Sequence, residues 1–250
     1  MSPFRATLLL AILAATANGQ VIQARQPRLL DQWVFGLSGF GGIPVGEFKQ
    51  HEDGGGGMEM TLGYQMFRRQ PLVLRGNAGF LMYGRYSRDN ERDVCDNFGN
   101  CTTETFFYNS RYHNMTFLQI GPEIMATDGR WRPFAYALTG VTFFNSWANY
   151  GWSNGSGTPS RTLFSAHNLS SAYGAGIRLS SNNGGREAGW ELAFRLTRNA
   201  KATYLTDDSV FPQSNGSWIV SPRTGAANVL GIHLGFFVGP FVNWNERRVR

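Results

Sequence analysis

The chain has 250 residues, of which 16% are charged, 14% are aromatic and 31 are glycine, and its formal net charge is +6. Average soluble domains carry about 25% charged residues, so this composition argues against an ordinary water-soluble domain and is typical of a membrane-spanning barrel. The positive charge is nearly all arginine and is scattered along the chain, which argues against a nucleic-acid-binding protein.

The first 17 residues have the features of a cleavable signal peptide. Arg5 supplies the positive charge, residues 6–14 form an apolar stretch, and Ala15-Thr16-Ala17 provides the small residues of a cleavage site. Residues 18–31 are polar and unpatterned, which predicts a short periplasmic lead-in. After the signal there is no run of about 18 apolar residues, so we expect no membrane-spanning helix in the mature chain.

Residues 32–244 hold eight segments in which large apolar residues alternate with small or charged ones. A period of two is typical of a strand with two unlike faces. Long polar segments and short turns alternate between these strands, as they do in outer-membrane barrels. The strands are predicted at 32–43, 56–67, 72–86, 112–126, 131–145, on both arms of a hairpin within 171–198, and at 225–241.

The hairpin at 171–198 shows the alternation most clearly. On its second arm Leu192 and Phe194 alternate with Glu191 and Arg195. A soluble barrel would turn the apolar face inward, whereas a transmembrane barrel turns that face to lipid. We favour the membrane arrangement because the opposite face is rich in glycine and because the strands exceed the five or six residues that are about typical of globular sheets.

The alternation also assigns side chains to the two sides of the wall. In the strand at 131–145 it predicts that Phe134, Tyr136 and Leu138 form the lipid-facing set. An eight-stranded barrel is only wide enough to be filled by side chains, and buried charges are very unfavourable unless they are paired. We therefore expect a lumen closed by ion pairs. The predicted lumen cluster comprises Glu59, Arg75, Glu123, Arg178, Glu191, Arg195 and His233.

Two further features belong to an exported barrel. The polar segment at 87–111, expected to be a loop, contains both cysteines, Cys95 and Cys101, and their spacing predicts a disulfide. Tryptophans near predicted strand ends suggest an aromatic girdle at the membrane interface. The predicted girdle consists of Trp33, Trp131, Trp190 and Trp244.

Several stretches together resemble the small OmpA-like outer-membrane β-barrel proteins. They are Ile43-Pro44-Val45-Gly46-Glu47-Phe48, Leu62-Gly63-Tyr64, Arg132-Pro133-Phe134-Ala135-Tyr136 and the glycine-rich closing strand. The resemblance implies an all-β, closed, antiparallel up-and-down barrel in the outer membrane of a diderm bacterium. It also implies contact with outer-membrane lipid and lipopolysaccharide, and assembly by machinery that reads an aromatic residue such as Phe241 or Trp244. Residues 245–250 extend past these as a charged tail.

We expect a structural or surface-interaction role through the outer loops, without catalysis, metal or cofactor. Three alternatives stay open: a narrow porin-like channel, a lipid-modifying outer-membrane enzyme, and a secreted soluble ligand-binding barrel. The enzyme would need a nucleophile, a base and an orienting acid within hydrogen-bond reach. The sequence shows no partner for His51 or His113, and His167 lacks the spacing to serine that lipid A deacylases use.

Overall fold

The computed structural model describes residues 33–66, 71–95, 101–126, 129–152, 161–183, 186–199, 201–212 and 218–239. The predicted signal peptide at 1–17, the lead-in at 18–31, the charged tail at 245–250 and Trp244 lie outside the described residues. Within the described ranges no helix is both long and apolar enough to cross a membrane.

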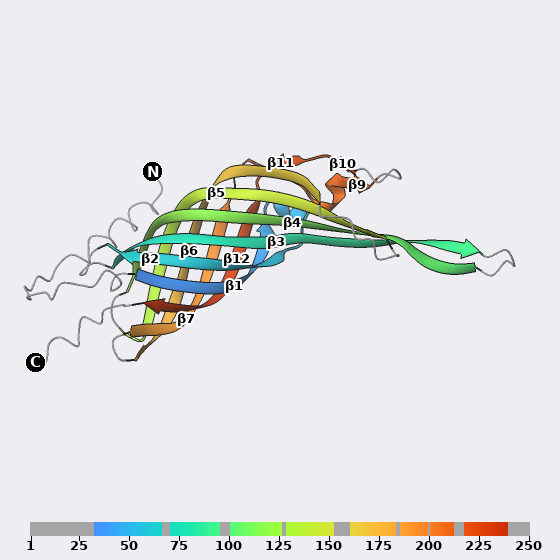
Figure 1. The fold of residues 1–250 in the computed structure, drawn as a ribbon. Coiled ribbons are helices and arrows are strands. Elements are labelled where there is room, and N and C mark those ends of the chain that lie inside the picture. The colour runs from blue at the N-terminus through green and yellow to red at the C-terminus, as the bar shows by residue number, and fades with distance from the viewer. Residues whose placement is uncertain are drawn as a thin grey trace, which may run out of the picture.

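Eight strands form a closed antiparallel barrel in the order β1-β12-β7-β6-β5-β4-β3-β2 (Figure 1). Neighbours along the chain pair with each other, and β1 pairs with β12 from Phe35↔Val238 to Val45↔Asn228 to close the wall. The all-β up-and-down fold and the strand number are thus confirmed. The bounds are β1 Trp33–Val45, β2 Gly55–Gln65, β3 Leu72–Cys95, β4 Cys101–Met125, β5 Trp131–Trp152, β6 Arg161–Asn183, β7 Arg186–Arg198 and β12 Asn228–Gly239.

The two ends of the barrel differ. At one end, here called the turn end, short connections join β2 to β3, β4 to β5 and β6 to β7. The other end, here called the ribbon end, carries the 3-10 turn η2 (Phe48–Gln50), the extensions of β3 and β4, and the connection from β7 to β12. That connection contains β8 (Ala202–Tyr204), η3 (Asp207–Ser209), β9 (Val210–Pro212), β10 (Trp218–Val220) and β11 (Arg223–Gly225), which pair as β8–β11 and β9–β10.

The prediction of a loop at 87–111 was wrong, because β3 and β4 continue through most of it. They leave the barrel as a two-stranded ribbon that pairs as far as Cys95↔Cys101 (Figure 1). The ribbon stands clear of the barrel in Figure 1, and its sequence lacks the regular alternation that marks the other strands. The predicted disulfide is confirmed and joins the last cross-strand pair, with a Cα–Cα distance of 3.9 Å.

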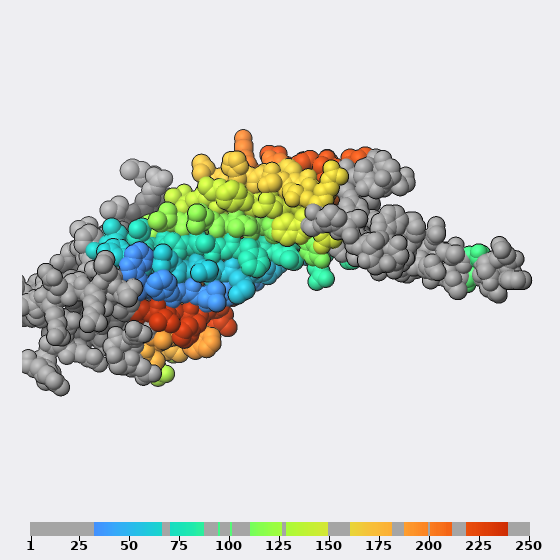
Figure 2. Space-filling view, viewed as in Figure 1, coloured from blue at the N-terminus to red at the C-terminus, as the bar shows by residue number. Residues whose placement is uncertain are grey.

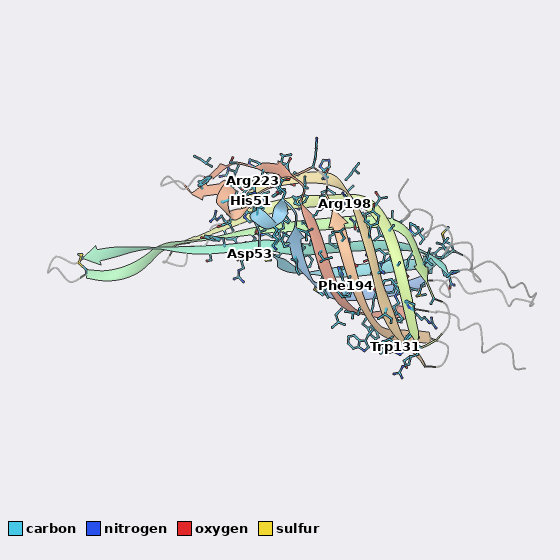
Figure 3. All side chains as sticks on the ribbon, turned by 180° about the vertical axis from the view of Figure 1, so that it is seen from behind. His51, Asp53, Trp131, Phe194, Arg198 and Arg223 are labelled. Carbon is cyan, nitrogen blue, oxygen red and sulfur yellow. A yellow bond between two sulfur atoms is a disulfide. The ribbon has the colours of Figure 1, made fainter. Side chains whose placement is uncertain are left out.

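The wall of the barrel is apolar outside and polar inside. On β7 the side chains of Leu192 and Phe194 point outward and these residues are 43% and 54% exposed, whereas Arg195, the next residue, points inward and is 2% exposed. In Figure 3 Phe194 and Trp131 project from the outer surface, and in Figure 2 the side chains of adjacent strands form a continuous wall. A soluble barrel would have these faces reversed, so the secreted soluble alternative does not fit this structure.

One strand reverses the predicted faces. Phe134, Tyr136 and Leu138 on β5 are 4%, 6% and 3% exposed and fill the lumen, so their assignment to lipid was wrong. The reason lies on the neighbouring strand: a Cβ at Gly174 would lie 2.3 Å from the Tyr136 ring, and one at Gly176 would lie 2.7 Å from the Phe134 ring. The glycines of β6 leave the volume that the rings of β5 occupy.

A charge placed on the outer wall should destabilise the barrel in a bilayer. We expect Phe194→Arg to reduce the free energy of unfolding in lipid vesicles by about 2–4 kcal/mol, because arginine is costly near the bilayer midplane. Phe211→Arg is the matched control, since Phe211 is 52% exposed but lies on β9 outside the barrel wall. Its effect should stay within about 0.5 kcal/mol. Equal losses in urea titrations would contradict the orientation of the wall.

Candidate functional site

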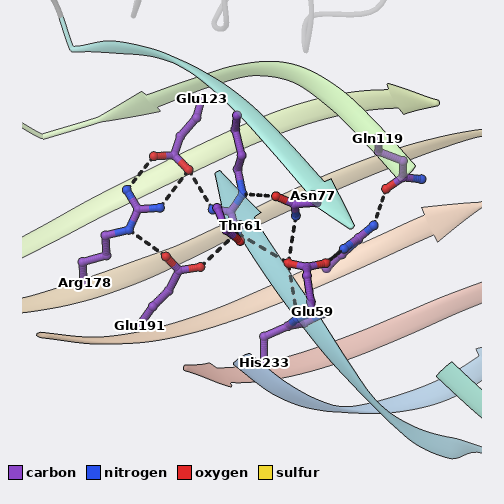
Figure 4. Close-up of polar contacts among 10 residues, drawn as sticks. Glu59, Thr61, Asn77, Gln119, Glu123, Arg178, Glu191 and His233 are labelled. Carbon is purple, nitrogen blue, oxygen red and sulfur yellow. Dashed lines mark hydrogen bonds and ion pairs between the residues drawn. The ribbon is translucent and has the colours of Figure 1, made fainter. Parts of the chain in front are cut away.

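Three glutamates and three arginines meet inside the barrel, about halfway along its strands (Figure 4). All six residues are at most 9% exposed, and they contribute equal numbers of positive and negative charges. They project from five strands, so only the closed barrel brings them together. The residues are Glu59 on β2, Arg75 on β3, Glu123 on β4, Arg178 on β6, and Glu191 and Arg195 on β7.

Glu123 and Glu191 bridge two arginines. Glu123 accepts a 2.7 Å hydrogen bond from Nη1 of Arg75 and bonds of 2.6 and 3.0 Å from Nη1 and Nη2 of Arg178. Glu191 accepts from Nε of Arg178 at 2.7 Å and from Nη2 of Arg75 at 3.1 Å. The four groups form a closed ring of charge-assisted bonds, which are stronger than neutral ones.

Glu59 gathers the remaining charged groups of the lumen. It forms an ion pair with Arg195, and its Oε1 accepts a 2.8 Å bond from Asn77. The same oxygen lies 3.6 Å from Nη2 of Arg75, which joins this group to the ring. Nδ1 of His233 on β12 lies 3.9 Å from Oε1 of Glu59. The structure therefore places all seven residues of the predicted lumen cluster in one connected network.

Neutral side chains complete the network, and of these the alternation had placed Gln119 with the inward charges, whereas Thr61, Asn77 and Ser170 were not predicted as site residues. Arg75 donates to Asn77 Oδ1 at 2.9 Å and to Thr61 Oγ1 at 3.1 Å. Arg195 donates to Gln119, whose Nε2 donates in turn to Ser170 Oγ at 2.8 Å. Their inward positions follow from the alternation, but their hydrogen-bond partners depend on how the strands are staggered.

Aromatic rings cover the guanidinium groups. Arg75 lies 4.3 Å from the ring centre of Tyr136, and Arg178 lies 4.5 Å from that of Phe134. On the other side of the network Arg195 lies 4.3 Å from the ring of Phe117. These cation–π contacts hold charge at the ring faces where water is excluded. The inward rings of β5 are thus part of the site.

The network is one layer of a filled lumen. Toward the turn end lies an apolar cluster that includes Val34, Phe134 and Phe237, and toward the ribbon end a second cluster that includes Phe48, Phe144 and Tyr204. A cavity of about 10 Å³ lies beside the network, which is room for about one water molecule. Its lining residues are Phe40, Leu81, Met115, Phe117, Arg195, Thr197, Val229, Gly231 and His233.

The tryptophans of the predicted girdle occupy the outer wall where they are described. Trp131 and Trp190 are 59% and 58% exposed, and Trp190 packs edge-on against Phe236 at 5.9 Å. Trp33 begins β1 and lies 4.9 Å from the ring of Tyr64.

Two histidines have partners that the sequence did not reveal. His113 Nδ1 lies 2.7 Å from Ser146 Oγ, and His51 lies 3.8 Å from Asp208. The pair of His113 and Ser146 is buried, with both residues at most 1% exposed. Within the described part of the chain, no group of three or more His, Cys, Asp or Glu residues is placed to hold a metal ion.

A closed eight-stranded barrel with an apolar outer wall and a polar filled lumen defines the class of this protein: it has the fold of a small OmpA-like outer-membrane barrel. No protein-family model matches the chain. No curated protein matches it in sequence either.

Solved structures similar to this chain are outer-membrane barrels. Neisserial surface protein A is 8% identical, with 84% of this chain and 97% of that chain covered and a TM-score of 0.43. Ail, the attachment invasion locus protein of Yersinia pestis, is 13% identical, with 83% and 97% covered and a TM-score of 0.40 in its complex with sucrose octasulfate. The outer membrane protease OmpT of Escherichia coli is 8% identical, with 86% and 98% covered and a TM-score of 0.38.

The charged ring predicts strong coupling between its members. Glu123→Ala should reduce the free energy of unfolding by about 3–5 kcal/mol, because it leaves two buried guanidinium groups short of a carboxylate. The double variant Glu123→Ala/Arg178→Ala should lose less free energy of unfolding than the two single variants lose together. We expect the difference to be about 0.5–3 kcal/mol. Urea unfolding of the four proteins of this cycle in lipid vesicles measures the difference, and strictly additive losses would show that the ring is not cooperative.

Proposed function

We propose that the protein is an outer-membrane surface protein that binds extracellular partners through its ribbon end, while the ion-pair network keeps its lumen closed to solutes. The ribbon end then faces the cell exterior and the short turns face the periplasm, which is the usual arrangement of outer-membrane barrels. Outer-membrane lipid and lipopolysaccharide surround the apolar wall, and the barrel-assembly machinery inserts it.

The observation that carries the proposal is the ribbon of β3 and β4. The pairing of β2 with β3 begins at Gly56↔Met82, so β3 beyond residue 82 has no neighbour on that side among the described strands. On its other side β3 stays paired with β4 to Cys95↔Cys101. An unpaired strand edge offers backbone donors and acceptors to an added strand of a partner.

The disulfide supports the same role. An isolated two-stranded ribbon is marginally stable in water, and it loses the packing that holds the strands of the barrel. The bond between Cys95 and Cys101 ties the two strands together at the far end of the ribbon, where β5 no longer flanks β4. A ribbon held in this way keeps its two strands paired, so that the free edge of β3 stays extended.

Surface attachment tests the proposal. In the test variant Arg88 is joined to Asn109 through an Asn-Gly turn, which removes the outer part of the ribbon and keeps Arg111 and the barrel strands. Cells expressing the full chain should attach to surfaces and to one another more than cells expressing the variant. Retained heat-modifiability on gels shows that the variant barrel still folds. Equal attachment by the two folded proteins would refute a role for the ribbon.

The closed lumen predicts that the purified protein does not conduct ions. In planar bilayers we expect negligible conductance, because the guanidinium and carboxylate groups and the apolar layers on both sides leave room for about one water molecule. Sustained unitary openings of the unmodified protein would instead support the channel alternative. A matched recording with Glu123→Ala tests whether the ion pairs are what keeps the lumen shut.

A further inference from the structure

At the ribbon end Tyr204 of β8 packs with the lumen residues Leu81 and Met115. The connection to which it belongs is here called the cap and is defined as β8, η3, β9, β10 and β11. The cap is anchored on its inner side by apolar packing, since Leu205 is fully buried. Two polar contacts add to this: the hydroxyl of Tyr83 donates to the carbonyl of Leu205 at 3.1 Å, and Arg111 donates to the carbonyl of Val210 at 2.7 Å. The cap is therefore bound to the barrel strands β3 and β4.

Glu52 lies at the seam between the cap and the connection from β1 to β2. It is 8% exposed, and its carboxylate accepts a hydrogen bond from the backbone N–H of Asp207 in the cap. Its second carboxylate oxygen, Oε1, is buried and has no hydrogen-bond partner among the described residues. Gly84 of β3 makes room for this side chain, because a Cβ there would lie 3.2 Å from Glu52 Oε2.

The charged groups around Glu52 are mostly acidic or already paired. In the cap, Asp207 pairs with Arg111 at 3.0 Å, and Asp208 pairs with Arg223 at 2.5 Å and lies 3.8 Å from His51. The groups that face the seam are His51 and Asp53 beside Glu52, Asp207 and Asp208 of η3, Arg111 and His113 of β4, Tyr83 of β3, Tyr204 of β8 and Arg223 of β11.

We propose that Glu52 is a proton-operated latch: the protonated side chain holds the cap over the mouth of the lumen, and its ionisation releases the cap. A neutral carboxyl group still accepts the hydrogen bond from Asp207 through its carbonyl oxygen. An ionised one adds a buried negative charge next to two aspartates, and burying an unpaired charge is unfavourable.

The electrostatics agree with this geometry. Burial, and then the charges of Asp207, Asp208 and Asp53, raise the pKa of Glu52 to about 8. In the open cap the side chain meets water and returns toward its ordinary pKa of 4.5. The closed state therefore binds the proton more tightly. Opening is independent of pH below the lower pKa, grows about tenfold per pH unit between the two values, and levels off above the higher one.

The consequence is a change of surface at the ribbon end. Release of the cap uncovers the buried pair of His113 and Ser146, together with Tyr83, at the mouth of the lumen. The ion-pair network lies deeper, between the two apolar clusters, and none of its carboxylates belongs to the seam. The latch therefore alters what the ribbon end presents while the lumen stays closed.

Hydrogen exchange of the full chain in lipid nanodiscs, from pH 5 to pH 9, tests the latch. The main reporting amide is Asp207, whose N–H donates to Glu52 across the seam, and Ser209 and Ser221 of the cap are followed beside it. Met125, which donates to Pro71 at the turn end, is the control amide. After correction for intrinsic exchange, protection of the cap amides should fall about tenfold per pH unit up to about pH 8 and then level off, with Met125 unchanged.

Two variants test whether Glu52 causes the pH dependence of protection in the cap. Glu52→Gln should remove the contribution of Glu52 and flatten the profile. Glu47→Gln is the matched control, because Glu47 accepts from the N–H of Ala226, directly after the cap, at 3.1 Å but is exposed. It should keep the full slope. A flat profile in the unmodified protein, or the same slope with Glu52→Gln, would overturn the proposal.

Discussion

The ion-pair network at the centre of the lumen is the interaction on which the rest of the structure depends. Its three carboxylates and three guanidinium groups are almost completely removed from water. Such burial is unfavourable unless each charge has partners with good geometry, and Glu123, for example, receives three hydrogen bonds from two arginines. Only a closed barrel with its polar face inward brings these residues of five strands together.

The same network sets the shape of the interior. Guanidinium groups are large and need aromatic rings or carboxylates beside them. The lumen therefore needs open volume and such partners at the positions along the barrel where the arginines lie. Gly174 and Gly176 give up side-chain volume on β6, and Tyr136 and Phe134 on β5 fill it and cover Arg75 and Arg178. Because the charged groups of the network all lie in the lumen, the outer wall can consist of large apolar residues that match lipid.

Much of this arrangement could be predicted from the sequence because a strand period of two divides the residues into two faces. Glu191 and Arg195 point inward for the same reason that Leu192 and Phe194 point outward. The exception was β5, where both faces carry apolar residues and the larger ones pack inward. Which arginine meets which glutamate could not be predicted, since the stagger of strands distant in sequence decides it.

The ribbon and the cap escaped prediction for a different reason. Residues 87–111 lack a regular apolar alternation and look like a loop, although β3 and β4 pair as far as Cys95↔Cys101. The cap is built from strands of three residues, too short for any alternation to show. Glu52 acquires its burial from Asp207 and Gly84, which are 155 and 32 residues away in the sequence, and no local pattern marks that contact.

The orientation of the wall is the claim on which the account rests, and spin labels test it most directly. Leu192 and Leu234 are a cross-strand pair on the outer wall, 43% and 60% exposed. With cysteine-linked nitroxides at these positions in lipid vesicles, the account predicts frequent collisions with dissolved oxygen and few with a water-soluble nickel chelate. A label at Phe211 of β9 should show the reverse. Ready collision of the chelate with labels at Leu192 and Leu234 would contradict the account.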